Sequence, residues 1–177
     1  MRSRRVHAPR PTVAEPRPLL LAAVLTFVKA AAGIAGVQRI ALIGSLTTDK
    51  RVPHDADVLV TIDADMDLAP LARLSRGLKG RCQHINLGAD IFLADSADRY
   101  LGRICGYREC FRRVLCRAEN CGLRQHLNDD LHVITLSPDL IAAPAVELWP
   151  RVLRRVHLPS DVEAVLLHDL EQPVPPA

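Results

Sequence analysis

The stretch from Arg39 to Ile62 reads RIALIGSLTTDKRVPHDADVLVTI, and it decides the fold prediction. Its apolar runs at 40–43 and 58–60 flank a polar loop, which predicts a strand, a turn and a second strand. Side chains two apart on a strand share a face, so Asp55 and Asp57 are expected to point the same way, roughly 6–7 Å apart. Two like charges at the head of a buried strand are costly unless a cation lies between them. The pattern therefore predicts divalent-metal and phosphate chemistry.

A third carboxylate, Asp90, lies in the middle of a later extended and mostly apolar stretch, 85–93. A lone aspartate inside an apolar strand is expensive to bury without a partner. If this strand lies beside the strand of Val58, Asp90 reaches the face of the first two aspartates. Three carboxylates suit one or two Mg²⁺ ions, which favour oxygen ligands and substrate phosphates. Gly44 would let the loop backbone approach a phosphate, and Ser45 would donate a hydrogen bond to it.

Gly44-Ser45, a nine-residue gap, Asp55-Ala56-Asp57-Val58 and the later strand aspartate resemble the nucleotidyltransferase superfamily of the DNA polymerase β type, in particular its minimal and antibiotic-modifying members. The resemblance covers roughly residues 19–93. It implies an α/β (α+β) fold with a mixed sheet and flanking helices. It also implies Mg²⁺-dependent transfer of a nucleoside monophosphate from an NTP, such as ATP, to a hydroxyl of an unidentified acceptor, whether small molecule, protein or RNA.

The resemblance also assigns roles to residues. Asp55 and Asp57 would ligate both Mg²⁺ ions, and Asp90 would ligate the catalytic ion and help to activate the acceptor hydroxyl. Gly44 and Ser45 would hold the triphosphate.

The loop between the two strands departs from the family pattern. Family members often follow the serine with a helix that carries an arginine, whereas this chain has Leu46 to Arg51. Lys50 or Arg51 would still reach a γ-phosphate, although Asp49 would oppose it. A second interpretation therefore stays open, namely a catalytically degenerate nucleotide-binding module or a zinc-supported module that binds nucleic acid or protein.

Composition bounds the rest of the chain. The 177 residues are 49% hydrophobic, which is enough for a real core. Residues 1–18 hold five arginines and one glutamate, which is a net charge of +4. The formal net charge of the whole chain is +3, so the other 159 residues carry −1. This balance excludes a domain that binds nucleic acid through net charge alone. Four segments are predicted: a disordered basic tail (1–18), a nucleotidyltransferase core (19–96), a Cys/Arg-rich extension (97–136) and a helical C-terminus (137–177).

The apolar run from Leu19 to Val28, continued by Lys29 to Ala32, allows two interpretations. It is either a packed helix that precedes the first strand or the apolar centre of a secretory signal peptide. The packed helix places the protein in the cytoplasm, and the signal peptide would export it. The run is too short for a membrane span, so no membrane partner is expected.

Further elements follow from local signals. Asp67 is expected to cap a helix that Gly80 ends, and 131–136 is expected to form a strand. Ser160 and Glu163 form a capping-box pattern that opens a last helix to about Leu170.

Four of the five cysteines lie close together as Cys105-x4-Cys110-x5-Cys116-x4-Cys121. The spacing is at the edge of what a structural Zn²⁺ site uses, so zinc ligands, unpaired thiols and disulfides all stay open. Asp129 and Asp130 are either a further metal contact or a turn before a strand. The arginines of this region are either a phosphate-facing patch or a solvated surface: Arg103, Arg108, Arg112, Arg113, Arg117 and Arg124.

Overall fold

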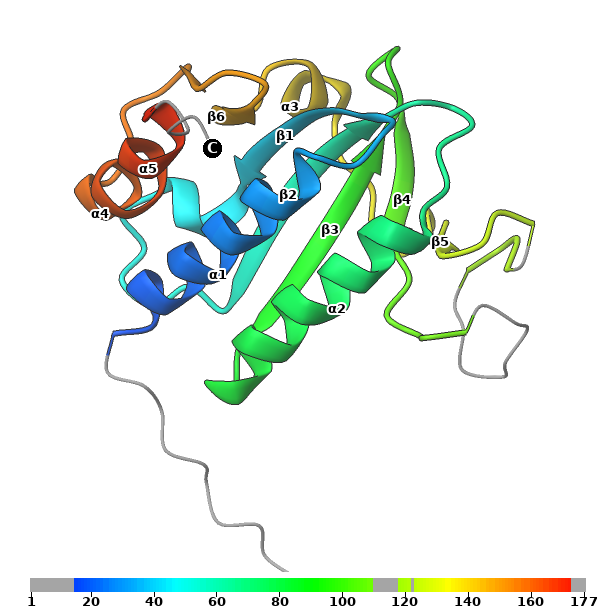
Figure 1. Cartoon of the computed structure of the whole chain (residues 1–177), viewed down its shortest axis with the longest axis horizontal. Helices are drawn as coiled ribbons and strands as arrows, with labels where there is room; N and C mark the ends of the chain where they lie inside the picture. The colour runs from blue at the N-terminus through cyan, green and yellow to red at the C-terminus, as the bar shows by residue number, and fades with distance from the viewer. Residues whose placement is uncertain (1–14, 110–117, 122, 173–177) are drawn as a thin grey trace, which may run out of the picture.

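The fold is α+β, with one seven-stranded mixed sheet flanked by helices (Figure 1). It is known from a computed structural model that describes residues 15–109, 118–121 and 123–172. The elements follow in the order α1 (Pro16–Ala31), β1 (Val37–Ile43), the 3₁₀ turn η1 (Gly44–Thr47), β2 (Asp55–Ile62), α2 (Ala69–His84), β3 (Gly88–Ala94), β4 (Tyr100–Ile104), β5 (Leu127–Asn128), α3 (Pro138–Ala142), β6 (Val146–Trp149), β7 (Leu153–Arg154), α4 (Ser160–Val162), the π-helical segment η2 (Glu163–Leu167) and α5 (His168–Glu171).

The sheet has the strand order β5-β4-β3-β2-β1-β6-β7. The β2 and β3 strands are parallel and are joined through α2, whereas the other neighbouring strands are antiparallel. Parallel strands need such a crossover connection, which puts a helix on one face of the sheet. The predicted strand–loop–strand is confirmed: β1 and β2 pair in antiparallel fashion, with Ile43 opposite Asp57.

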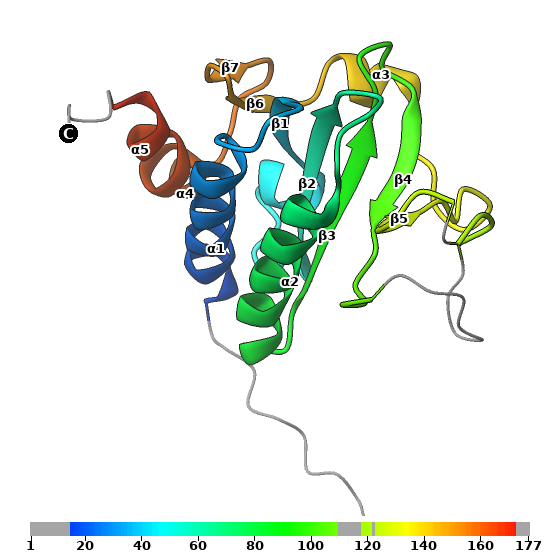
Figure 2. The same cartoon turned by 45° about the vertical axis from the view of Figure 1, so that its right-hand side comes forward.

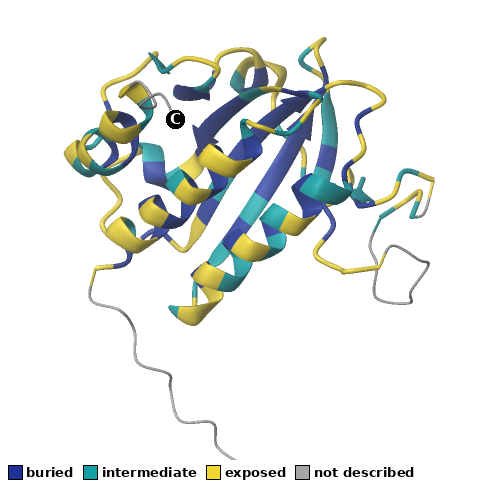
Figure 3. Cartoon of the chain, viewed as in Figure 1, coloured by how far each residue is buried: buried dark blue, intermediate teal, exposed yellow. Residues whose placement is uncertain are grey.

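One face of the sheet is covered by α1 and α2, which lie side by side (Figure 2). Even-numbered side chains of β1 and β2, such as Leu42 and Val58, pack there with Val24 and Leu71 in the main core. The helices bury one side and expose the other, and the central strands are mostly buried (Figure 3). The apolar run before β1 is therefore a packed helix.

The opposite face carries a smaller apolar cluster built from Ala41, Ile43, Leu59 and Phe92 together with the α3 residue Ile141. The segment that precedes α3 adds Ile134 and Leu136 to this cluster. Residues 131–136 were predicted to be a strand, and this prediction is wrong, because the segment packs its side chains onto the sheet instead of pairing with it.

Three other expectations are corrected at the chain's helices. The tail was expected to reach residue 18, but α1 begins at Pro16, because proline suits the first turn of a helix. The Asp67 carboxylate accepts a hydrogen bond from the Ala69 N–H (2.9 Å), as expected, yet α2 continues past Gly80 to His84. Ser160 makes no capping hydrogen bond, although a continuous helical segment does run from it to Glu171.

The C-terminal segment is not purely helical, which corrects another expectation. The β6 strand pairs with β1 through Leu42 and Val146, and β7 extends the sheet beyond it. Burial explains the difference, because Val146 and Leu148 complete the core that faces the helices. Strands from outside the predicted core of residues 19–96 therefore extend the sheet at both of its edges.

Within the described ranges, no helix combines the length and the continuous hydropathy that crossing a bilayer requires.

Candidate functional site

The three predicted aspartates lie at the start of the two parallel strands. Asp57 on β2 is directly opposite Asp90 on β3, and Asp55 is opposite Gly88. The alternation of side chains places all three on the face of Leu59 and Phe92, away from α1 and α2. The strand pairing therefore places the three aspartates on one face of the sheet, as the sequence predicted.

Gly44 lies against Asp57. Its backbone is left-handed (φ +71°), and a Cβ placed on it would fall 2.5 Å from Asp57 Oδ2. Glycine is needed here both for the backbone conformation and for the space. A similar approach occurs between Gly88 and Asp55, where an added Cβ would overlap Oδ1 of the carboxylate. Two glycines thus make room for two of the acidic side chains.

The electrostatics of the site are unfavourable for negative charge. Burial, followed by the charges of Asp55 and Asp90, raises the pKa of Asp57 to about 6. Burial and the charge of Asp55 likewise raise the pKa of the Cys82 thiol to about 11. A carboxylate in these surroundings would be stabilised by a bound cation, because opposite charge favours the ionised form.

Asp90 already has two basic partners. Lys79 Nζ, from α2, lies 3.1 Å from Asp90 Oδ1, and Arg103 Nη1, from β4, lies 3.3 Å from Oδ2. Among the described residues, no three His, Cys, Asp or Glu side chains come close enough to hold one metal ion together. The two ion pairs engage both oxygens of the Asp90 carboxylate.

Arg103 connects this site to a buried carboxylate. Its Nη2 donates to Asp130 Oδ2, and the Asp130 side chain has no solvent exposure. The Tyr100 hydroxyl, Arg103 Nε and Asp130 Oδ1 are buried close by without a hydrogen-bond partner in the described part of the chain. Burial raises the pKa of Tyr100 to about 12; the charge of Arg103 opposes this rise, and the charges of Asp130 and Asp90 add to it. In this structure Asp130 thus forms a buried ion pair with Arg103.

The phosphate-binding residues predicted in the loop are not all gathered at the aspartates. Gly44 and Ser45 begin the η1 turn, which the Thr47 hydroxyl closes by donating to the Gly44 carbonyl (2.8 Å). The Lys50 and Arg51 side chains are exposed, and Arg51 lines a separate surface hollow beside the start of α1.

Arg17 holds the loop in place from α1. Its guanidinium donates to the carbonyls of Leu46 (3.0 Å), Thr48 (3.0 Å) and Lys50 (2.9 Å). Its Nε and Nη2 donate to the two oxygens of Asp161 in α4 (2.6 and 3.0 Å). All five guanidinium N–H donors are thus engaged. This side chain fixes the backbone that follows Ser45.

Only two of the four clustered cysteines can be placed. Cys105 is buried at the end of β4 and Cys121 is half-buried, whereas Cys110 and Cys116 lie outside the described residues. The zinc hypothesis therefore stays a prediction. Cys82, expected in the core, is buried there.

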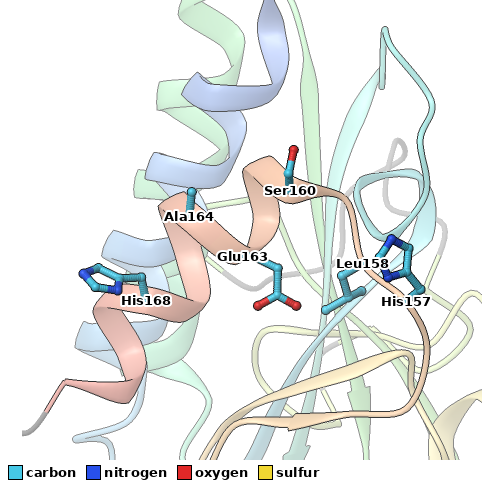
Figure 4. Close-up of a pocket in the computed structure, with 6 residues that line it drawn as sticks. All are labelled: His157, Leu158, Ser160, Glu163, Ala164 and His168. Carbon is cyan, nitrogen blue, oxygen red and sulfur yellow. The ribbon is translucent and has the colours of Figure 1, made fainter.

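Another surface hollow, of about 600 Å³, lies on the C-terminal helical segment (Figure 4). The imidazoles of His157 and His168 are at opposite ends of it, with Glu163 between them. Glu163 is paired with Arg154 (2.9 Å), so these side chains do not converge on one ligand position.

The sequence did not predict the observed contacts of four residues that shape the site: Lys79, Arg103, Asp130 and Arg17. The arginines of 103–124 were considered as a patch for phosphate or as a solvated surface, and Arg103 is neither in this structure because it points inward from β4. Lys79 had a local signal, since a lone lysine follows an apolar helical pattern.

Comparison with protein-family models, with curated proteins and with solved structures gave no match to this chain.

Proposed function

We propose that this chain binds a complex of a divalent cation with a nucleoside triphosphate and transfers the nucleoside monophosphate to a hydroxyl acceptor. The observation that carries the proposal is the pairing of Asp57 with Asp90 on adjacent parallel strands, with Asp55 on the same face and Gly44 against Asp57. The proposal extends the resemblance to nucleotidyltransferases of the DNA polymerase β type.

The donor set fits Mg²⁺. Asp55 and Asp57 supply carboxylate oxygens, which are the ligands that Mg²⁺ prefers together with phosphate oxygens. Burial and like charges raise the pKa of Asp57 to about 6, so a cation there would offset an existing electrostatic cost. When bound, the metal would supply neutralisation of the developing charge on the transferred phosphoryl group.

The chain's own residues would divide the remaining work. Gly44 and the η1 turn would bring backbone N–H groups near the phosphates, in a loop that Arg17 keeps fixed. Asp90 would help to hold the catalytic cation and to activate the acceptor hydroxyl. Lys79 and Arg103 occupy both oxygens of this carboxylate, so the role requires that at least one of them moves away.

The ion pairs of Asp90 favour a second candidate function, a module that binds a metal–nucleotide complex without turnover. Lys79 and Arg103 neutralise the group that would act on the acceptor. A chain of this kind would retain Asp55 and Asp57 for the cation and would use the bound nucleotide as a signal.

Two measurements distinguish the candidates. Pyrophosphate release from ATP, GTP, CTP and UTP with Mg²⁺ is compared for the wild type, Asp57→Asn and the control Asp65→Asn, an exposed aspartate outside the site. We expect release that Asp57→Asn abolishes and Asp65→Asn leaves unchanged. Nucleotide binding by calorimetry without release would support the second candidate. Release that survives Asp57→Asn would refute the site assignment.

A further inference from the structure

The two basic partners of Asp90 differ in how firmly they are held. Arg103 bridges two carboxylates, Asp90 (3.3 Å) and the fully buried Asp130. A guanidinium that lost contact with Asp130 would leave a buried carboxylate without its partner, which is costly. Arg103 is therefore fixed in place by a residue outside the acidic site.

Lys79 has no such anchor in the described structure. Among the described residues its ammonium pairs with Asp90 Oδ1 alone (3.1 Å), and its side chain is 23% exposed. Lysine carries a compact charge on a flexible four-carbon stem, so it can leave a carboxylate at low cost. Asp90 itself lies on the same sheet face as Asp55 and Asp57, directly opposite Asp57.

We propose that Lys79 is an exchangeable counter-cation that competes with the divalent cation for Asp90. In the metal-free protein its ammonium neutralises the carboxylate. When a divalent cation binds at the aspartates, Lys79 is displaced toward solvent while Arg103 stays on Asp130. The inference rests on the proposed function for the position of the cation. It goes further by assigning Lys79 the control of metal affinity at that site.

The test measures Mn²⁺ binding alone, by calorimetry and by the loss of the free-ion electron paramagnetic resonance signal. Lys79→Gln should tighten Mn²⁺ binding by about 3- to 10-fold, because a partly buried ion pair no longer competes. The control is Lys29→Gln, which removes a lysine from an ion pair of the same length with Asp169, and it should leave Mn²⁺ binding unchanged.

A double-mutant cycle separates competition for Asp90 from the general effect of removing a positive charge. In an Asp90→Asn background, Lys79→Gln should change Mn²⁺ affinity by less than twofold. Equal tightening in both backgrounds would overturn the inference, and so would a Lys79→Gln variant with unchanged affinity.

The outcome is independent of turnover. Tighter Mn²⁺ binding by Lys79→Gln, in a protein that releases no pyrophosphate, would refute nucleotidyl transfer and support the role of Lys79. Pyrophosphate release by the wild type, together with a Mn²⁺ affinity that Lys79→Gln leaves unchanged, would support nucleotidyl transfer and refute the role of Lys79.

Discussion

Asp57 Oδ2 occupies the space into which any side chain at Gly44 would extend, since a Cβ at position 44 would lie 2.5 Å from it. Gly44→Ala should therefore do two things. The left-handed backbone and the close contact should lower the free energy of unfolding by about 1–2 kcal/mol. Asp57 should also turn away, so Mn²⁺ binding should weaken beyond what the stability change explains.

The matched control for this substitution is Gly77→Ala, in the exposed part of α2. Nothing lies within 4 Å of a Cβ at position 77, so alanine there should stabilise the helix by about 0.5–1 kcal/mol. Urea denaturation and calorimetry measure both effects. Unchanged Mn²⁺ affinity in Gly44→Ala would contradict the assigned closeness of the loop to the metal ligand.

The raised pKa of Asp57 predicts a stability profile with a defined sign. In the unfolded chain the carboxyl ionises near 3.8, whereas in the folded protein it holds its proton to about pH 6. Between these values the folded state binds more protons than the unfolded chain, so protonation of Asp57 favours folding. This stabilisation is complete below pH 3.8 and is lost as the pH rises through 6. Partial solvent access reduces the loss to about 2 kcal/mol.

Asp57→Asn should lack this loss. The difference in free energy of unfolding between the variant and the wild type should shift by about 2 kcal/mol in favour of the variant from pH 4 to pH 7. Urea denaturation at each pH measures it. Asp65→Asn serves as the control, and Mg²⁺ at pH 7 should stabilise the wild type but not Asp57→Asn. Parallel profiles for the wild type and Asp57→Asn would show that the carboxyl is not perturbed.

Arg17 should be a determinant of loop order. Arg17→Gln removes five hydrogen bonds and leaves Asp161 without its cation, so we expect a loss of about 2–3 kcal/mol in stability. Trypsin should also cut faster after Lys50 and Arg51, because the carbonyls of this loop lose their donor.

Arg154→Gln is the control for Arg17→Gln. Arg154 also joins two carboxylates, Glu163 and Glu171, but these pairs are exposed, so the cost should be below about 1 kcal/mol. Mass spectrometry of the early tryptic fragments locates the cleavage. A loop that is cut at the wild-type rate in Arg17→Gln would show that other contacts determine its conformation.

Arg103 and Asp130 should show strong energetic coupling. Arg103→Met leaves a carboxylate with no solvent exposure and no cation, which should cost about 3–5 kcal/mol. Asp130→Asn in the same chain should recover a large part of that loss, because the uncompensated charge is gone. Urea denaturation of the two single variants and the double variant measures the coupling, and additive losses would refute it.

The elements predicted correctly have short-range signals. The apolar runs that became α1, β1, β2 and β3 have a clear period or flanking turns, and Asp67 supplied a local start for α2. The face shared by Asp55 and Asp57 follows from the alternation of a strand, which needs no knowledge of the partner strand.

The elements predicted wrongly depend on distant partners. Val146 to Trp149 is a four-residue segment between two prolines, and only its pairing with β1 makes it a strand. Gly80 ends a helix in isolation, but packing of Cys82 in the core extends α2 beyond it. The ion pairs of Asp90 with Lys79 and Arg103 depend on how α2 and β4 lie beside β3, and no spacing in the sequence encodes this arrangement.

The position of β1 inside the sheet, between β2 and β6, affects how the protein folds. One edge of β1 is closed by β2, which follows it immediately, but the other edge waits for β6 near the C-terminal end. Until then an apolar strand presents unpaired N–H and C=O groups that can template association with another chain. During synthesis this edge of β1 is thus covered only after β6 has been made, and fragments that stop after β3 should aggregate.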